Sequence, residues 1–160
     1  MVTSPDHRRI HAVVVNWSGG QAALDCVRSL LAQPLAPENV VFVDNASSDD
    51  SCEQAVEQFP GLTVIRNDSN LGYGYANNQG IRLALDRGAE MVFLVNNDVV
   101  VPEGTLDILL QRLGADPNLG VVGPRVLYRD DPSRVWAAGG FLTFRQNLTT
   151  LLGHEGPDDE

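Results

Sequence analysis

Lysine is absent from the sequence, and all 11 basic residues are arginine. The chain therefore has no phosphate-binding P-loop lysine, no Schiff-base lysine and no lysine general base, which excludes several classes of enzyme. Positive charge is also scarce, since 21 acidic residues bring the formal net charge to -10. A protein that binds the phosphate backbone of a nucleic acid needs a basic face, so we expect no nucleic-acid partner.

Long hydrophobic runs are missing as well. No stretch approaches the roughly 20 apolar residues that a transmembrane helix needs. The apolar residues 10–15, which follow a basic N-terminal segment, are too few for a signal peptide. We therefore expect a cytoplasmic protein without a transmembrane segment.

Cysteine occurs only twice, at Cys26 and Cys52, and both positions fall within predicted helices. Neither cysteine belongs to a CxxC pair or has a histidine at ligand spacing, so buried free thiols are expected rather than a metal site or a disulfide. With 160 residues, of which 43% are hydrophobic and 20% charged, the chain has the size and composition of one soluble globular domain.

What the sequence does contain is a fourfold alternation of strand and helix. Apolar strands are predicted at residues 10–15, 40–43, 62–65 and 91–95, and helices at 21–33, 47–59, 73–87 and around 105–114. Because the strands are apolar nearly throughout, we expect a mostly parallel α/β sheet with helices on both faces, joined by right-handed crossovers.

The pattern loosens after this alternation. Short strands are expected at residues 120–124, 126–128, 135–137 and 141–144, the last three antiparallel. The resulting domain covers residues 10–145, between a flexible N-terminus at 1–9 and an acidic tail at 146–160 that is expected to be disordered.

The segment at residues 91–102, MVFLVNNDVVVP, is the one around which the chain is organised. Five apolar residues predict a strand buried on both faces, in the middle of the sheet, and Asp98 follows close after the end of that strand. Ligands of open α/β sheets bind at the carboxyl ends of the strands, so Asp98 is a candidate for chemistry. The alternative is that residues 96–98 only form a turn, which asparagine and aspartate favour.

Polar residues follow two other strands in the same way. Asn16 and Trp17 come after the first strand, and Asp44 and Asn45 after the second. Each pair alone fits a turn, but the ends of parallel strands share one rim, where together they predict a pocket. A tryptophan beside an aspartate suits a heterocyclic base, because the ring stacks on the base and the carboxylate accepts a hydrogen bond.

Asp98 would then meet the phosphates of such a ligand. Two like charges about 4 Å apart repel by roughly 4 kcal/mol at an effective dielectric constant near 20, so a cation must lie between them. Mg²⁺ or Mn²⁺ fits this role, because Mg²⁺ commonly takes one or two carboxylates, waters and phosphate oxygens. Asn96 lies on the same side of an extended chain and can offer a neutral oxygen, unless it only caps the turn.

Four segments resemble one known family in unbroken order. They are VVVNW at residues 13–17, VDNASSD at 43–49, NLGYGYANNQGI at 70–81 and LVNNDV at 94–99. Together they resemble the nucleotide-binding half of family 2 glycosyltransferases, which have the GT-A fold, a Rossmann-like arrangement. The similarity covers roughly residues 10–140 and points to the rhamnosyltransferase-like branch, which builds bacterial surface and cell-wall polysaccharides.

The resemblance implies an inverting transfer of a sugar, with rhamnose among the candidates. The donor would be a dTDP- or UDP-sugar, and the acceptor a glycan or a lipid-linked molecule, which is compatible with peripheral association at the inner membrane. Residues 10–145 would be the nucleotide-sugar-binding domain. The residues that the family pattern assigns to the donor are Asn16 and Trp17 at the base, Asp44 and Asn45 at the base or ribose, Asn70 and Gly72 in the closing loop, Asn77 near the diphosphate, Asn97 in the Asp-X-Asp position, and Asn96 and Asp98 at the metal.

The sequence departs from the family pattern at three places. Asn96 replaces the first aspartate of the Asp-X-Asp motif, which is familiar in the rhamnosyltransferase-like branch, and Asn77 stands where many relatives carry an arginine. Nothing in residues 120–160 resembles the family's catalytic base segment. The acids Asp130, Asp131 and Glu155 are expected at the solvated surface, and the chain is expected to stop before the acceptor half.

Two alternatives to a transferase remain open. One is a non-catalytic module that binds nucleotide sugars, because the base segment is missing. The other is a dinucleotide-dependent oxidoreductase, suggested by the repeated strand and helix units but disfavoured because the first loop, NWSGG at residues 16–20, lacks the GxGxxG fingerprint.

Overall fold

The computed structural model describes residues 9–142 and 149–156. The chain divides into two compact units, Met1–Leu106 and Asp107–Glu160. Of the N-terminal segment 1–9, which was predicted to be flexible, only Arg9 is among the described residues, and its guanidinium forms an ion pair with Glu90. Among the described residues, no helix is both long and apolar enough to cross a membrane.

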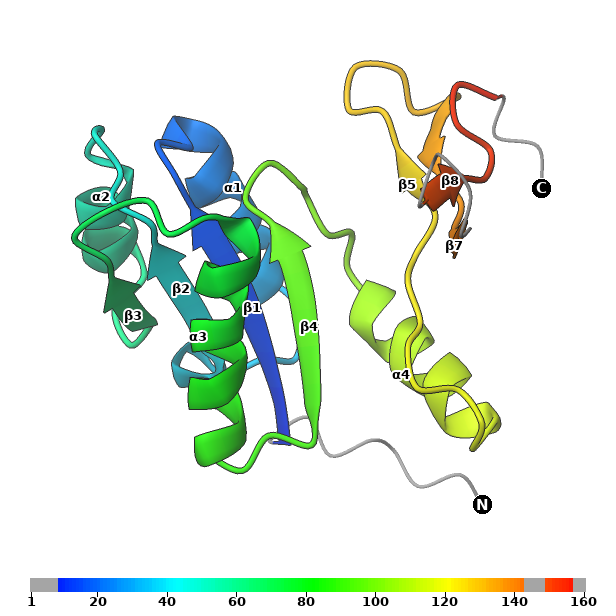
Figure 1. Cartoon of the computed structure of the whole chain (residues 1–160), viewed down its shortest axis with the longest axis horizontal. Coiled ribbons are helices and arrows are strands. Elements are labelled where there is room, and N and C mark those ends of the chain that lie inside the picture. The colour runs from blue at the N-terminus through cyan, green and yellow to red at the C-terminus, as the bar shows by residue number, and fades with distance from the viewer. Residues whose placement is uncertain (1–8, 143–148, 157–160) are drawn as a thin grey trace. The chain divides into compact units, whose positions relative to one another are not determined.

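The first unit is built on a four-stranded parallel sheet (Figure 1). Its strands are β1 (Ile10–Asn16), β2 (Val40–Asp44), β3 (Thr63–Arg66) and β4 (Met91–Asn96), in the order β3-β2-β1-β4. In this register Asn16 pairs with Asp44, and Val15 pairs with Asn96. The carboxyl ends of three strands thus meet at one edge, which confirms the predicted α/β sheet and its shared rim.

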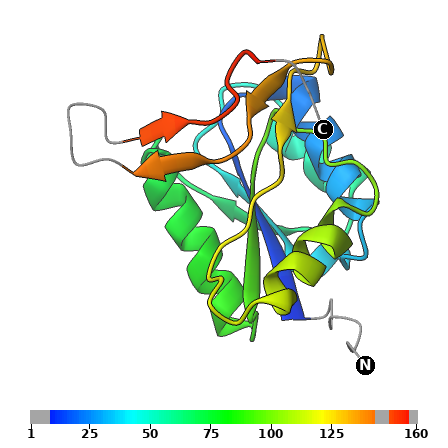
Figure 2. The same ribbon diagram turned by 90° about the vertical axis from the view of Figure 1, so that its right-hand side faces the viewer.

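Helices cover both faces of this sheet. The helices α1 (Gly20–Leu31) and α2 (Ser51–Gln58) pack against each other, and a short 3-10 helix, η2 (Pro37–Asn39), precedes β2. The helix α3 (Tyr73–Asp86) lies on the opposite face from α1 (Figure 2). On the α3 side the core consists of alternate valines of β1 and β2 with Ala76.

The buried face of α3 is made mainly of small residues. Ala76, Gly80 and Ala84 are buried, whereas Leu85 is 53% exposed. A β-carbon at position 80 would lie 2.4 Å from Val13 Cγ1 and 3.3 Å from Val43 Cγ2. At Gly80 the helix approaches the sheet so closely that no side chain larger than hydrogen fits between them without a shift.

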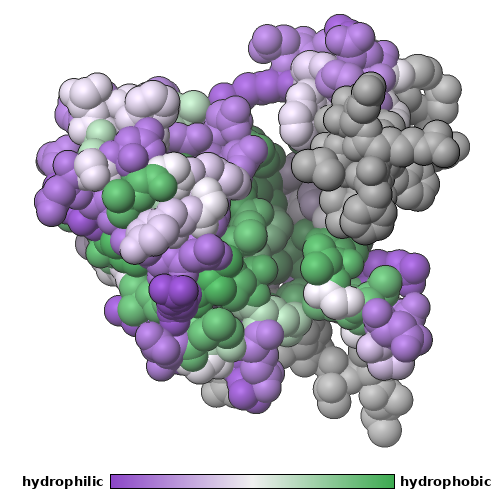
Figure 3. Space-filling view, in the orientation of Figure 1, coloured by the Kyte–Doolittle hydropathy of each residue, from purple (hydrophilic) through white to green (hydrophobic). Residues whose placement is uncertain are grey.

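The strand β4 lies at the edge of this sheet, and β1 lies inside it. The prediction that residues 91–95 form a central strand is therefore wrong for the described sheet. Of the β4 residues only Val95 is fully buried, and Leu94 is 48% exposed. Figure 3 shows apolar residues at the surface of the first unit around α3 and β4, and hydrophilic residues near the upper end, where the strands terminate. A continuous apolar run does not reveal whether its strand is central.

The second unit contains two antiparallel strand pairs. The strands β5 (Val126–Leu127) and β6 (Val135–Ala137) form one pair, β7 (Gly140–Leu142) and β8 (Thr149–Leu151) form the other, and the helix α4 (Thr105–Ala115) precedes them. No strand forms at residues 120–124, contrary to prediction. The strand β8 lies within the tail that was expected to be disordered, while residues 143–148 and 157–160 of the predicted segments lie outside the described residues.

The close contact at Gly80 leads to a prediction about stability. Gly80→Ala should lower the free energy of unfolding by about 1–3 kcal/mol, because the new methyl group overlaps Val13. Gly114→Ala in α4 is the matched control: its β-carbon meets nothing within 4 Å, so this change should stabilise the chain by up to about 1 kcal/mol. Denaturant unfolding measures both. Equal stability of Gly80→Ala and the unsubstituted chain would contradict the close packing.

The two thiols provide a second prediction. Cys26 and Cys52 are free and buried, as expected, and burial raises their pKa values to about 12 and about 11. In addition, the Cys26 thiol donates to the Asn96 carbonyl over 3.3 Å. Since both groups stay protonated near neutral pH, neither should react with a thiol reagent at pH 8 in the folded chain, and both should react in denaturant. Rapid labelling of either cysteine in the folded chain would contradict this description.

Candidate functional site

A pocket of about 410 Å³ lies at the carboxyl end of the parallel sheet. The ends of β1, β2 and β4, the loop after β3 and the first residue of α3 all contribute to it. Its lining residues are Val15, Trp17, Asn45, Asn70, Tyr73, Asn96, Asn97 and Asp98. The pocket therefore forms where the rim of strand ends was predicted.

Most of the described residues that line this pocket are polar, and none of them is basic. Asp98 is its single carboxylate, accompanied by four asparagine amides and two aromatic rings. Trp17 is 62% exposed, so one large aromatic surface is available to a ligand. Such a pocket offers stacking, hydrogen bonds and one negative charge, but nothing that would by itself neutralise an anion.

The loop after β3 is fixed to the end of β2 by a chain of amides. Asn45 is buried, and its Nδ2 donates to Asn70 Oδ1 over 2.8 Å. Asn45 Oδ1 accepts from the backbone N–H of Leu71 and from Asn67 Nδ2, each over 3.1 Å. Asn67 in turn exchanges two hydrogen bonds of 2.9 Å with Gln79 on α3. Three segments are therefore held together beside the pocket, two of them through residues that sequence reasoning had missed.

Tyr73 was missed as well, although it is the first residue of α3 and lines the pocket. Its hydroxyl donates to Asn96 Oδ1 over 2.6 Å and so links the helix to β4. Gly72, the N-cap, has a φ of 83°, which a residue with a β-carbon rarely adopts, and no side chain caps the helix. Gly72 thus supports the turn into α3, and its backbone N–H donates to Asn70 Oδ1 over 2.9 Å.

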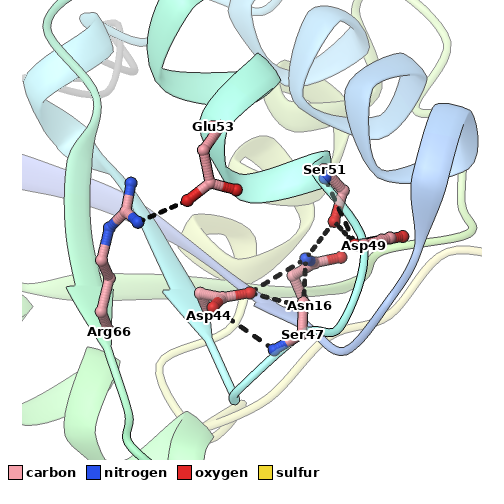
Figure 4. A network of polar contacts seen from close by, with 7 residues as sticks. All are labelled: Asn16, Asp44, Ser47, Asp49, Ser51, Glu53 and Arg66. Carbon is pink, nitrogen blue, oxygen red and sulfur yellow. Dashed lines mark hydrogen bonds and ion pairs between the residues drawn. The ribbon is translucent and has the colours of Figure 1, made fainter.

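Asn16 and Asp44, expected at the base or ribose of a nucleotide, are not among the lining residues of the pocket. Asn16 is 0% exposed and Asp44 is 8% exposed. Both side chains point to the face covered by α1 and α2, because side chains alternate along a strand and Val15 faces the pocket. Figure 4 shows them in a network with Ser47, Ser51 and Asp49. The sequence therefore did not indicate which face of the sheet each of these side chains occupies.

Asn77 is also absent from the lining. It is 5% exposed, and its Nδ2 donates to the Tyr73 carbonyl over 3.0 Å, while its buried Oδ1 has no hydrogen-bond partner within the described part of the chain. The pocket does gather six other predicted residues, namely Trp17, Asn45, Asn70, Asn96, Asn97 and Asp98, whereas Gly72, which was predicted in the closing loop, is not among its lining residues. Asp131, one of the loop acids, accepts hydrogen bonds from Ser133 in a local turn, which agrees with a surface role.

The donor set of the pocket can be compared with the needs of a divalent cation. Within the described part of the chain, no group of three or more His, Cys, Asp or Glu residues could hold a metal ion. One carboxylate with neighbouring amide oxygens does fit Mg²⁺ or Mn²⁺, provided that waters and phosphate oxygens complete the coordination. The residues present therefore fit an ion that binds together with an anionic ligand.

Solved structures with this fold support the comparison with glycosyltransferases. A mannosyltransferase from Pyrobaculum calidifontis, PcManGT, in complex with GDP-Man and Mn²⁺, is 25% identical, with a TM-score of 0.60 over 74% of this chain and 36% of that one. Staphylococcus aureus TarS 1-349 in complex with UDP-GlcNAc is 20% identical, with a TM-score of 0.54 over 76% of this chain and 38% of the other. Both likenesses confirm the predicted GT-A-like fold.

Sequence comparison identifies the family. N-acetylglucosaminyl-diphospho-decaprenol L-rhamnosyltransferase of Mycobacterium tuberculosis is 32% identical over 151 residues, which cover 88% of this chain and 48% of that protein. Glycosyltransferase GlyG of Streptococcus pneumoniae is 27% identical over 107 residues, 65% of this chain and 35% of the other. The chain thus spans about half the length, or less, of these relatives. The profile described as "Glycosyl transferase family 2" matches residues 12–158, and this chain therefore belongs to glycosyl transferase family 2.

Proposed function

We propose that this chain forms the donor-binding part of an inverting glycosyltransferase. The enzyme would move a sugar, with rhamnose as a candidate, from a nucleoside diphosphate to a glycan or lipid-linked acceptor in polysaccharide synthesis. The observation that carries the proposal is the pocket at the strand ends, with an exposed tryptophan at one place and a lone carboxylate at another. The related rhamnosyltransferase, whose name specifies a diphospho-decaprenol acceptor, supports the proposed reaction.

The base of the donor would stack on the ring of Trp17, a contact that does not depend on the identity of the base. Asn45 and Asn70 are held rigidly by their mutual hydrogen bond and would bound the ribose side of the pocket. The loop at residues 67–72 would thus contact the nucleotide without having to become ordered on binding, which lowers the cost of association.

Asp98 would hold Mg²⁺ or Mn²⁺ between the protein and the diphosphate. The bound ion supplies neutralisation of the leaving diphosphate. The chain's contribution is positional: Asp98 follows β4, and Asn96 Oδ1 is kept in place by the Tyr73 hydroxyl over 2.6 Å. PcManGT, which was solved with GDP-Man and Mn²⁺, supports a role for a divalent metal together with a nucleotide sugar.

The proton of the acceptor hydroxyl must be removed by another group. Among the described residues that line the pocket, Asp98 is the only one with a carboxylate, and its proposed role is to hold the metal. The general base would therefore come from outside these lining residues.

The cytoplasmic location, with peripheral contact to a membrane that carries the acceptor, stays a prediction.

Asp98 provides the test of the metal site. Nucleotide sugars with UDP, dTDP or GDP should raise the melting temperature of the chain when Mn²⁺ is present, because a ligand at 100 times its Kd stabilises by about 2.7 kcal/mol. Asp98→Ala should abolish this shift, and Asp130→Ala, which removes an exposed carboxylate elsewhere, should keep it. Equal shifts in the unsubstituted chain and Asp98→Ala would reject the metal role.

Trp17 provides a separate test of the base site. Trp17→Ala should weaken binding of UDP or dTDP by about 5- to 160-fold, since base stacking on an aromatic ring contributes roughly 1–3 kcal/mol. Trp17→Phe should retain part of the affinity. Trp136→Ala is the matched control, because Trp136 is also exposed but does not line the pocket. Isothermal titration measures all three variants, and unchanged affinity in Trp17→Ala would exclude stacking at this position.

A further inference from the structure

We infer that Asn16 is a positioning residue that ties the turn carrying Asp98 to the start of α2, acting through Asn97. This inference rests on the proposed function for its consequence at the metal, but the link itself is a property of the free protein. Asn16 is 0% exposed, so its side chain cannot touch a donor. Any effect of Asn16 on ligand binding must therefore pass through the groups that it contacts.

On one side the Asn16 amide is oriented by hydroxyls and carboxylates. Its Nδ2 donates to Ser47 Oγ over 2.9 Å and to Ser51 Oγ over 2.8 Å, and lies 3.2 Å from Asp44 Oδ1. The two serines donate onward, Ser47 to Asp44 and Ser51 to Asp49, each over 2.5 Å (Figure 4). The hydrogen bond from Ser51 holds the pKa of Asp49 below its usual value, so this end of the relay is an anion at neutral pH.

This arrangement fixes which way the Asn16 amide faces. A flipped amide would place its oxygen against hydroxyl oxygens that already donate to carboxylates, and against Asp44 itself, so it would lose its hydrogen bonds. The oxygen must therefore point away from α2. There, Asn16 Oδ1 accepts from the Gly19 N–H over 3.2 Å and from Asn97 Nδ2 over 3.1 Å. Both lone pairs and both N–H groups of this buried amide are thus used.

Asn97 transmits this constraint to the pocket. It lies between Asn96 and Asp98, in a turn closed by the Val99 N–H, which donates to the Asn96 carbonyl over 3.2 Å. Anchoring the Asn97 side chain limits how far the turn can move, and Asp98 moves with it. The position of the proposed metal ligand is therefore set partly by serines and acids at the end of β2 and in the loop that leads into α2.

Gly19 makes room for this link. A β-carbon at position 19 would lie 2.3 Å from Asn97 Nδ2 and 2.6 Å from Asn16 Oδ1. The two amide groups that share the hydrogen bond would have to separate, because Asn16 is held at the end of β1 and Asn97 in the turn after β4. A side chain at position 19 should thus break the link without removing either asparagine.

The first experiment measures the link in the ligand-free chain by amide hydrogen exchange. Asn97→Ala and Gly19→Ala should raise exchange of the Val99 amide by about 2- to 10-fold, the range expected for the loss of one hydrogen bond. The matched controls Asn78→Ala, at an exposed asparagine of α3, and Gly114→Ala should leave it unchanged. Unchanged Val99 exchange in both test variants would overturn the link, whether or not the protein binds a metal.

The second experiment measures the apparent Kd for Mn²⁺ with UDP at saturating concentration. Asn97→Ala, Gly19→Ala and Asn16→Ala should each weaken Mn²⁺ binding by up to about tenfold. The double variant Asn16→Ala/Asn97→Ala should have the same apparent Kd for Mn²⁺ as the single variant with the lower affinity, because the two residues act as one unit. If Asn16→Ala does not fold, Gly19→Ala and Asn97→Ala are combined in the same cycle.

The outcomes separate this inference from the proposed function. If the fold-changes in the apparent Kd for Mn²⁺ multiply in the double variant, Asn16 and Asn97 act independently and the inference is overturned. It is also overturned if the Mn²⁺ affinity stays constant in variants whose Val99 amide exchanges faster. If the unsubstituted chain binds no Mn²⁺ with UDP and matches Asp98→Ala, the proposed metal site fails. In that case the link is still decided by the exchange of Val99.

Discussion

Parallel pairing of β1 with a neighbour on each side is the constraint on which the candidate site depends. It places Asn16 opposite Asp44 and Val15 opposite Asn96. Three strands therefore end at the same level, and the last residue of each is polar. Without this register, Asn97 could not reach Asn16, which is 81 residues earlier in the chain.

Alternation along the strands then divides the rim into two layers with different tasks. Residues on the α3 side, such as Asn45 and Trp17, line the pocket. Residues on the other side, Asn16 and Asp44, are buried with serines at the start of α2. A ligand would thus meet a surface whose shape is maintained from beneath. Such support by buried hydrogen bonds is the usual requirement for holding binding groups in a fixed geometry.

The sequence predicted the order of the elements and the polar strand ends, because apolar periodicity and turn residues are local signals. It did not predict which side of the sheet the pocket occupies, since that depends on how α3 packs. Close packing at Gly80 brings the start of α3 to the rim and places Tyr73 in the lining of the pocket. The residues that Gly80 and Tyr73 contact in space are far from them in the sequence, so no local pattern could have indicated these contacts. The edge position of β4 was missed for a related reason, because strand order is decided by long-range pairing.

The lack of any basic side chain in the pocket lining affects how a charged ligand would arrive. A chain with a formal net charge of -10 repels a free nucleoside diphosphate over distances comparable to the Debye length. Added salt screens this repulsion, so the association rate should rise with ionic strength, opposite to the behaviour of pockets lined with lysine or arginine. A diphosphate already complexed with a divalent cation carries less charge and meets a lower barrier. In this protein the ion would thus lower the electrostatic barrier to association as well as bind at the site, and the metal concentration would affect the association rate of the donor.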